Sequence, residues 1–307
     1  MFTNHIGEFA ALFTAFCWTA TALAFESASN KVGSIAVNII RLCFALVFLS
    51  TFTLITRGHI LPTDASPHAW LWLSISGFIG FVLGDLFLFE SFIIVGSRIS
   101  MLMMTLVPPM TALISWIMLG ETLSSASILG MTLTLSGIAL VVLTKRTGEK
   151  NLSFNHPVKG IFFAFLGAVG QAVGLVFSKV GMGEYNAFAA TQIRIITGII
   201  GFAIVITLWK KWGNISAAFK NTKAIKRITI GSVFGPFLGV SFSLYAVQHT
   251  NAGIASTIMA ITPVLIIPPA ILFKKEKVTL REIIGAVVSI IGVALFFTEG
   301  LFSSLGF

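Results

Sequence analysis

The side chains able to carry chemistry are few, and they lie inside strongly apolar stretches of the chain. Asp85 and Glu90 stand in one such stretch, and Arg41 and Arg194 each stand in another. A charged side chain in an apolar segment is costly, so we expect it to pair with another charge, contact a substrate or carry a coupled proton. Their chemistry depends on which elements hold these four residues and bring them together.

The composition indicates that these elements are membrane-spanning helices. Hydrophobic residues make up 56% of the chain and charged residues only 10%, against about 25% charged in a soluble domain. Crossing the hydrocarbon core takes about 20 apolar residues in a helix. Ten segments meet this requirement and leave no soluble domain: they lie near 6–27, 34–56, 69–93, 98–119, 125–143, 157–180, 186–209, 228–248, 252–273 and 279–298.

An internal repeat organises the ten spans. When the chain is shifted by 155 positions, residues from about 75 to 140 align without gaps, and Pro108 falls on Pro263. Earlier in the chain the shift becomes 153, which places Arg41 on Arg194. The change of shift falls in a connection between spans, where insertions are tolerated.

Each half therefore holds five spans, with residues 1–147 in the first repeat and 148–307 in the second. Five crossings are an odd number, so the second half starts from the opposite side of the membrane. The predicted fold is all-α, with ten transmembrane helices in two inverted five-helix repeats. Inverted repeats with interrupted helices recur in secondary transporters, whose substrate site lies at the repeat interface near the midplane.

Prolines interrupt the fourth span of each half. A proline inside a helix removes one backbone hydrogen bond and clashes with the preceding turn. Pro108 and Pro109 stand in the first half and Pro263 in the second, and Pro268 and Pro269 add another interruption that the first half lacks. These prolines are compatible with two interpretations, a static kink and a moving gate, and the duplication favours a gate.

Arg41 and Asp85 are predicted to lie at similar depth on adjacent helices. Arg41 stands about two turns into the second span, and Asp85 about two turns before the end of the third, which runs back. An ion pair that fixes helix packing is favoured over a direct substrate contact. Glu90 is five residues beyond Asp85, so at about 100° per residue the two point to different faces.

At these two positions acidity belongs to the first half alone, since Val240 and Tyr245 are the repeat counterparts of Asp85 and Glu90. A substrate held between the halves would meet acid on one side and amide and guanidinium groups on the other, which suits a zwitterion or another polar metabolite. The polar residues that the second half offers are Gln171, Gln192, Arg194 and Gln248.

Three stretches carry a resemblance to a known family. "VPPMTALISWIMLGETLSSASILGMTLTLSGIALVVL" and "TPVLIIPPAILFKKEKVTLREIIGAVVSIIGVALFF" resemble the two copies of an EamA domain of the drug/metabolite transporter superfamily, and "FCWTATAL" is similar to its tryptophan-bearing first helix. The resemblance implies a permease that exports amino acids, related metabolites or drugs. It also implies that helices five and ten are scaffold, that the other eight enclose a cavity, and that Trp18 lines it. Lys275 and Val169 depart from the family pattern.

Two other classes compete with a transporter. An intramembrane enzyme is suggested by "VLGD" at 82–85, but the signature of membrane aspartyl proteases has a glycine where Val82 stands, and no second intramembrane aspartate completes a dyad. A lipid scramblase or channel would need a continuous polar groove or repeated rings of charge. We expect no enzyme activity, no cofactor and no metal site.

The net charge of +9 favours membrane contacts over nucleic acid. The expected partners are a small-molecule substrate and membrane lipids, for a monomer or homodimer in the cell membrane. Connections after odd-numbered spans hold 16 of the 20 Lys and Arg residues. Basic connections stay in the cytoplasm, so the charges place both termini outside, whereas the family resemblance implies termini inside.

Overall fold

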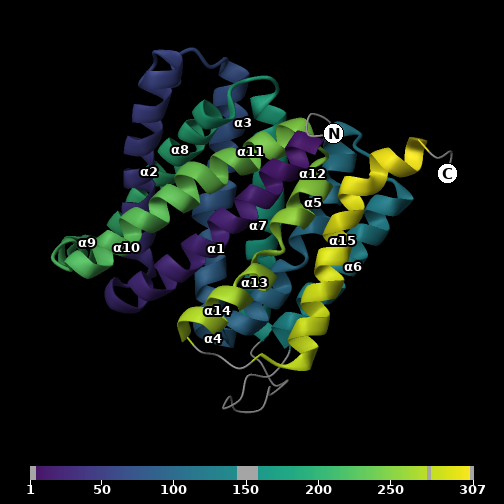
Figure 1. Cartoon of the computed structure of the whole chain (residues 1–307). Helices are drawn as coiled ribbons and strands as arrows, with labels where there is room; N and C mark the ends of the chain where they lie inside the picture. The colour runs from purple at the N-terminus through teal and green to yellow at the C-terminus, as the bar shows by residue number, and fades with distance from the viewer. Residues whose placement is uncertain (1–4, 144–157, 275–277, 305–307) are drawn as a thin grey trace.

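The computed structural model describes residues 5–143, 158–274 and 278–304, and within these ranges every regular element is a helix (Figure 1). The first half holds α1 (Ile6–Val32), α2 (Ser34–Arg57), α3 (Pro67–Gly77), α4 (Asp85–Met104), α5 (Val107–Leu119) and α6 (Ser125–Leu143). The second half holds α7 (Val158–Met182), α8 (Ala187–Leu208), α9 (Trp212–Phe219), α10 (Thr222–Ser232), α11 (Val240–His249), α12 (Ala252–Met259), α13 (Thr262–Leu265), α14 (Ile267–Lys274) and α15 (Leu280–Ser304).

The chain is an integral, multi-pass membrane protein. Nine helical segments of the described chain are long and apolar enough to cross a membrane, and a tenth apolar stretch, Ile6–Ala22, lies within α1. The predicted all-α membrane fold is therefore confirmed. The predicted boundary between residues 147 and 148 falls outside the described ranges, as do Lys145, Arg146, Lys150, Lys275, Glu276 and Lys277.

The third span of each half contains a π-helical segment at the same place in the repeat. One covers Phe78–Gly84 and the other Val233–Gly239, which lie 155 positions apart. The second segment contains Pro236, and because proline has no backbone N–H, one helical hydrogen bond is missing there. Single-turn π segments are rare and occur often at functional sites, because the wider turn redirects the side chains that follow. The residues that follow are Asp85 and Val240.

The reversal between the third and fourth spans lies inside α4. The hydroxyl oxygens of Ser91 and Ser100 are 2.7 Å apart. Nine residues of straight helix would separate them by about 13 Å. The chain therefore turns back between these two serines, which matches the predicted boundary between spans ending near 93 and starting near 98.

The interruptions predicted at the prolines are confirmed. In the fourth span, α4 ends at Met104 and α5 begins at Val107. In the ninth span, α12 ends at Met259 and α13 begins at Thr262. The ninth span has a second break between α13 and α14, just before the Pro268–Pro269 pair.

The crossing of α6 and α15 shows that the two halves are inverted. A Cβ on Gly130 would meet the carbonyl oxygen of Gly292 at 2.9 Å, and one on Gly285 would meet that of Gly137 at 2.7 Å. In the repeat, however, Gly130 corresponds to Gly285 and Gly137 to Gly292. Equivalent helices therefore run antiparallel about a two-fold axis in the membrane plane. Small residues at this crossing let the two backbones approach closely.

Each half also packs its third span against the first span of the other half. On α7, a Cβ on Gly174 would lie 3.0 Å from the Cα of Gly80 in the first π segment. On the other side of the molecule, a Cβ on Gly235 would lie 2.9 Å from the side chain of Thr21 in α1. The two repeats are thus interlocked, and the space enclosed near the middle of the bundle belongs to both.

Candidate functional site

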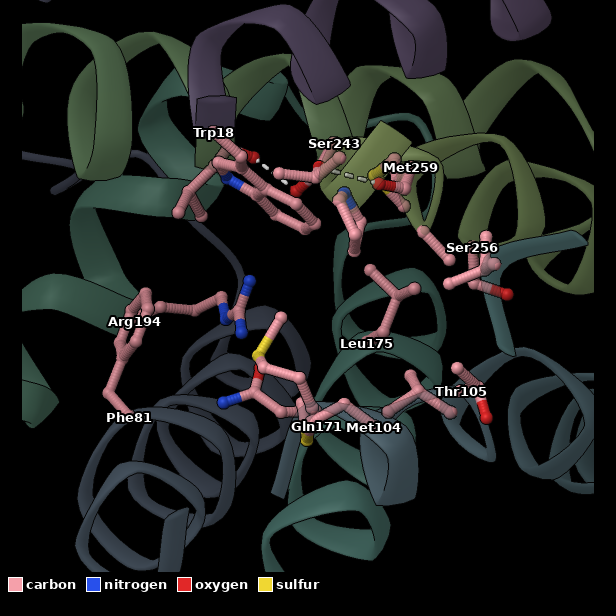
Figure 2. A pocket seen from close by; sticks show the side chains of 17 residues that line it. Trp18, Phe81, Met104, Thr105, Gln171, Leu175, Arg194, Ser243, Ser256 and Met259 are labelled. Atoms are coloured by element: carbon pink, nitrogen blue, oxygen red, sulfur yellow. Dashed lines mark hydrogen bonds between the residues drawn. The ribbon is translucent and has the colours of Figure 1, made fainter. Parts of the chain in front are cut away.

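A cavity of about 220 Å³ lies between the halves, beside the two helix breaks (Figure 2). Four pairs of repeat-equivalent positions line it, each pair separated by 155 residues. The pairs are Met101 with Ser256, Met104 with Met259, Thr105 with Ala260, and Val107 with Thr262. Because equivalent residues of inverted halves face the same space, the cavity surrounds the pseudo-two-fold axis.

The remaining wall comes from the spans around the breaks. Trp18 enters from α1, Gln171 and Leu175 from α7, and Arg194 from α8. Ile138 of α6 also lines the cavity, so the expectation that helix five serves only as scaffold is wrong at this residue. The other lining residues are Phe81, Val240, Ser243 and Pro263.

Arg41 and Asp85 form an ion pair, as the sequence predicted. Asp85 is 7% exposed, and its second carboxylate oxygen accepts a hydrogen bond of 3.2 Å from Nε2 of Gln171. The same amide donates to the carbonyl oxygen of Gly80 at 3.1 Å. Both oxygens of Asp85 are therefore engaged, and this carboxylate does not line the cavity.

Arg194, in contrast, extends its guanidinium into the cavity (Figure 2). It is 5% exposed, and its guanidinium carbon lies 4.8 Å from the centroid of the Phe81 ring. Glycines on the neighbouring helix make room for it: a Cβ on Gly77 would lie 2.9 Å from the Cα of Arg194, and one on Gly80 would lie 3.3 Å from Nη2. Small residues of the third span therefore let α8 approach closely and leave room for the Arg194 guanidinium.

An ion pair and several hydrogen bonds join the helices on the side of the bundle where α1 begins. Glu121, after α5, forms an ion pair with Lys179 of α7 and accepts a 2.8 Å hydrogen bond from the backbone N–H of Ala252. Lys179 also donates to the carbonyl oxygen of Thr250 at 2.7 Å, and the Thr250 hydroxyl donates to Glu8 at 2.8 Å. This terminal-side network, made of Glu8, Glu121, Lys179, Thr250 and Ala252, joins both halves.

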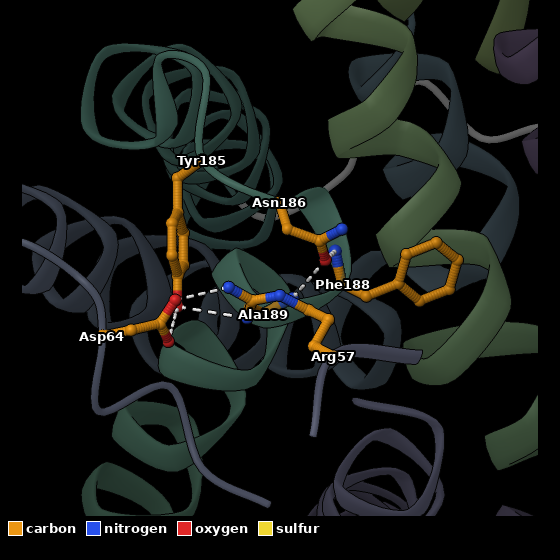
Figure 3. A network of polar contacts seen from close by, with 6 residues as sticks. All are labelled: Arg57, Asp64, Tyr185, Asn186, Phe188 and Ala189. Atoms are coloured by element: carbon orange, nitrogen blue, oxygen red, sulfur yellow. Dashed lines mark hydrogen bonds and ion pairs between the residues drawn. The ribbon is translucent and has the colours of Figure 1, made fainter. Parts of the chain in front are cut away.

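A second cluster on the same side joins the α2–α3 connection to the α7–α8 connection (Figure 3). Asp64 pairs with Arg57 at 2.5 Å and accepts a hydrogen bond of 2.9 Å from the Tyr185 hydroxyl. Desolvation by itself raises the pKa of Asp64, but the hydrogen bonds from Tyr185 and Arg57 outweigh it and hold that pKa below the usual value. The cluster is exposed, so its contribution to stability is small.

Five of the eight predicted cavity or coupling residues lie outside the cavity lining. Arg41 and Asp85 are in the ion pair, and Glu90 is exposed. Tyr245 stacks on His249, with ring centroids 4.2 Å apart. Gln248 donates hydrogen bonds to the carbonyl oxygens of Gly183 and Tyr185, at 2.7 and 3.2 Å, and so ties the α7–α8 connection. The three that line the cavity are Trp18, Gln171 and Arg194.

The sequence reasoning missed the residues just before each helix break. The 155-residue shift pairs Met104 with Met259, but the predicted cavity residues include neither. Their signal was available, because a position that directly precedes a broken turn in both inverted halves must approach the two-fold axis. The predicted cavity residues are mostly polar or charged, whereas much of this wall is apolar.

Comparison with known proteins agrees with this architecture. A sequence model of the EamA-like transporter family matches residues 5–143 and again 158–298. The chain belongs to the EamA-like transporter family. The double match corresponds to the two halves seen in the repeat and in the fold. The family that both halves match is one of transporters.

Two relatives and one solved structure extend the comparison. An uncharacterized transporter of Clostridium kluyveri is 25% identical over 178 residues, which are 58% of this chain and 56% of that one. An uncharacterized protein of Methanocaldococcus jannaschii is 29% identical over 135 residues, 44% of this chain and 93% of its own length. A crystal structure with 17% identity superposes with a TM-score of 0.74, covering 95% of this chain and 96% of its own, so the two share the fold.

Proposed function

We propose that this EamA-family protein is a permease that moves a small organic metabolite by alternating access between its two inverted repeats. The observation that carries the proposal is the position of the cavity, which lies on the pseudo-two-fold axis where both halves break a helix. Its volume of about 220 Å³ is below the roughly 300–1,000 Å³ of drug-sized pockets, which favours a small substrate.

The terminal-side network supplies one gate of this cycle. It joins Glu121 of the first half to Lys179 and Ala252 of the second by charge-assisted contacts. An inverted-repeat transporter must separate such contacts to open that side, because the halves rock against each other around a fixed site. In this proposal the ties form a closed gate on the terminal side.

A transport assay tests the proposal. Purified protein is reconstituted into liposomes loaded with a cell metabolite extract, and compounds that leave are identified by mass spectrometry against protein-free liposomes. We expect a small set of metabolites to exit only through the protein. Their absence, with protein shown to be folded and inserted, would contradict the permease assignment.

A reversible lock tests the gate itself. Cysteines replace Glu121 and Lys179 in a background where the free cysteines, Cys17 and Cys43, are alanine. Bridging them with a reducible bifunctional thiol reagent should stop transport, and reduction should restore it. Each single-cysteine protein, treated in the same way, is the control and should keep its activity.

The orientation is proposed from the charge distribution, with both termini outside the cell membrane. Of the 20 basic residues, only Arg57, at the end of α2, and Lys179, in the last turn of α7, stand at helix ends on the terminal side. A reporter that is active only in the cytoplasm, fused after Phe307, should give no signal. A strong cytoplasmic signal would reverse the assignment in favour of the family habit.

A further inference from the structure

Arg194 is a buried cation that lacks a carboxylate at ion-pair distance in the described part of the chain. Its guanidinium lies over the Phe81 ring, and Asp85 attracts it only from beyond that distance. Within that part, no carboxylate oxygen lies within 4.0 Å of its guanidinium, and its Nε is buried without a hydrogen-bond partner. A guanidinium carries five N–H donors. A charge held in a membrane interior is costly unless something pairs with it. The open position is the cavity that Arg194 lines.

The nearby carboxylate does not supply that partner. Both oxygens of Asp85 are occupied, one by Arg41 and the other by the amide of Gln171 at 3.2 Å. Arg41, Asp85 and Arg194 together carry two positive charges and one negative charge. Since no Asp or Glu is among the described residues that line the cavity, one positive charge is left facing it.

The other polar groups of the wall are poor anion donors. The hydroxyls of Ser243 and Ser256 donate to backbone carbonyls of their own helices, at 2.7 and 3.0 Å, and that of Thr262 donates to the carbonyl of Met259 at the end of α12, at 2.9 Å. They present lone pairs to the cavity rather than protons. The amide N–H groups of Gln171 are directed at Gly80 and Asp85. Arg194 is the one charged side chain among the described lining residues, so recognition of a negative charge falls to it, and the indole N–H of Trp18 offers a neutral donor beside it.

The rest of the wall suits an apolar body. Trp18, Met104, Leu175 and Met259 contribute broad, adaptable apolar surface around the guanidinium (Figure 2). Met101 also lines the cavity. We propose that the substrate is a small organic anion whose carboxylate binds Arg194 and whose apolar part packs on this wall. The inference rests on the proposed transport function and names its substrate class. A planar guanidinium matches a carboxylate with two parallel hydrogen bonds.

A matched set of four probes tests the assignment. The set is 2-hydroxy-4-methylpentanoate, its amide, leucine and leucinamide, which share one apolar body and differ in charge. Thermal unfolding of the purified protein is followed in chloride-free buffer at neutral pH with millimolar probe. Both carboxylates should raise the melting temperature in a saturable way, and both amides should not. Equal shifts from acids and amides, or no shift from either acid, would overturn the proposal.

Variants assign the effect to the arginine. Arg194→Gln should weaken carboxylate binding by about tenfold or more, because it removes the charge-assisted pair. Arg194→Lys keeps the positive charge but lacks the planar guanidinium that forms two parallel hydrogen bonds, so it should retain part of the binding. This variant also provides a test if Arg194→Gln fails to fold. Lys223→Gln removes a charge from an exposed residue away from the cavity and should change nothing. Carboxylate binding that survives in a folded Arg194→Gln protein would contradict the assignment.

The transport assay separates this inference from the function on which it rests. A protein that exports only neutral or cationic metabolites keeps its permease function, and the carboxylate assignment is wrong. A protein that binds the two acids through Arg194 and exports nothing keeps the anion site and loses the permease function. Export of carboxylates that falls in Arg194→Gln supports both.

Discussion

Arg41 and Arg194 occupy equivalent positions in the two repeats, yet their surroundings differ. Arg41 has a carboxylate partner in Asp85, whereas Arg194 faces a cavity and has no carboxylate within 4.0 Å among the described residues. The cause is one position: Asp85 follows the π segment of the first half, and Val240 follows that of the second. The two repeats thus share a scaffold and differ in whether a carboxylate pairs with the arginine.

Removing Asp85 should have the largest effect, because it turns Arg41 into a second unpaired arginine. Asp85→Ala should lower the free energy of unfolding by about 3–5 kcal/mol, the usual cost of leaving one partner of a buried ion pair alone. Unfolding in detergent measures it. Glu90→Ala, at an exposed position nearby, is the control and should change stability by no more than about 0.5 kcal/mol.

The charge exchange tests whether the pair acts as a pair. Combining Arg41→Asp with Asp85→Arg should recover part of the stability and transport that each single variant loses. A double variant no better than the singles would mean that the two residues act through separate contacts.

Val240→Asp gives the second half the carboxylate that the first half has. The new side chain should neutralise Arg194 and reduce carboxylate transport by about tenfold or more, since the substrate then competes with an internal partner. Val240→Asn, with nearly the same shape and no charge, should keep most of the transport. Equal carboxylate transport by the two variants would show that Arg194 does not recognise the negative charge of the substrate.

The helix breaks offer a third comparison between the halves. Cysteines placed after the prolines at equivalent positions, Met110→Cys and Leu265→Cys, should change their rate of thiol labelling when a transported metabolite is added. The change should be larger at 265, because the ninth span has a second break just beyond it. Val158→Cys, at a position 81% exposed, is the control and should label equally in both conditions. Unchanged rates at both test sites would reduce the prolines to static kinks.

The smallest effect is expected at the exposed pair of Arg57 and Asp64, in contrast to the buried pair of Arg41 and Asp85. Asp64→Asn should cost about 0–1 kcal/mol. Because the folded pKa of Asp64 is lowered, its contribution is present above the ordinary carboxyl pKa of about 3.9 and is lost as the pH falls through the folded value. Melting temperatures of wild type and variant should differ at neutral pH and converge in acid. A constant difference would assign the loss to packing.

Much of the fold followed from the sequence alone. The ten apolar segments, the 155-residue repeat and the odd number of spans per half predict an inverted architecture, because lipid admits only helices here and an odd count reverses the second half. The breaks near Pro108 and Pro263 followed from the missing backbone donor. The ion pair of Arg41 and Asp85 followed from matching depth on adjacent helices.

The tertiary structure decided which polar groups face the cavity. A rotation of about 100° per residue predicts helix faces only in a regular α-helix. The π segment Phe78–Gly84 has a wider turn, so the residues after it point in other directions than that rotation predicts. The spacing of residues also does not predict that Gln248 hydrogen-bonds to the α7–α8 connection or that Gln171 hydrogen-bonds to Asp85. Which of two equivalent arginines stays free depends on contacts between helices far apart in sequence, and those contacts exist only once the two halves interlock.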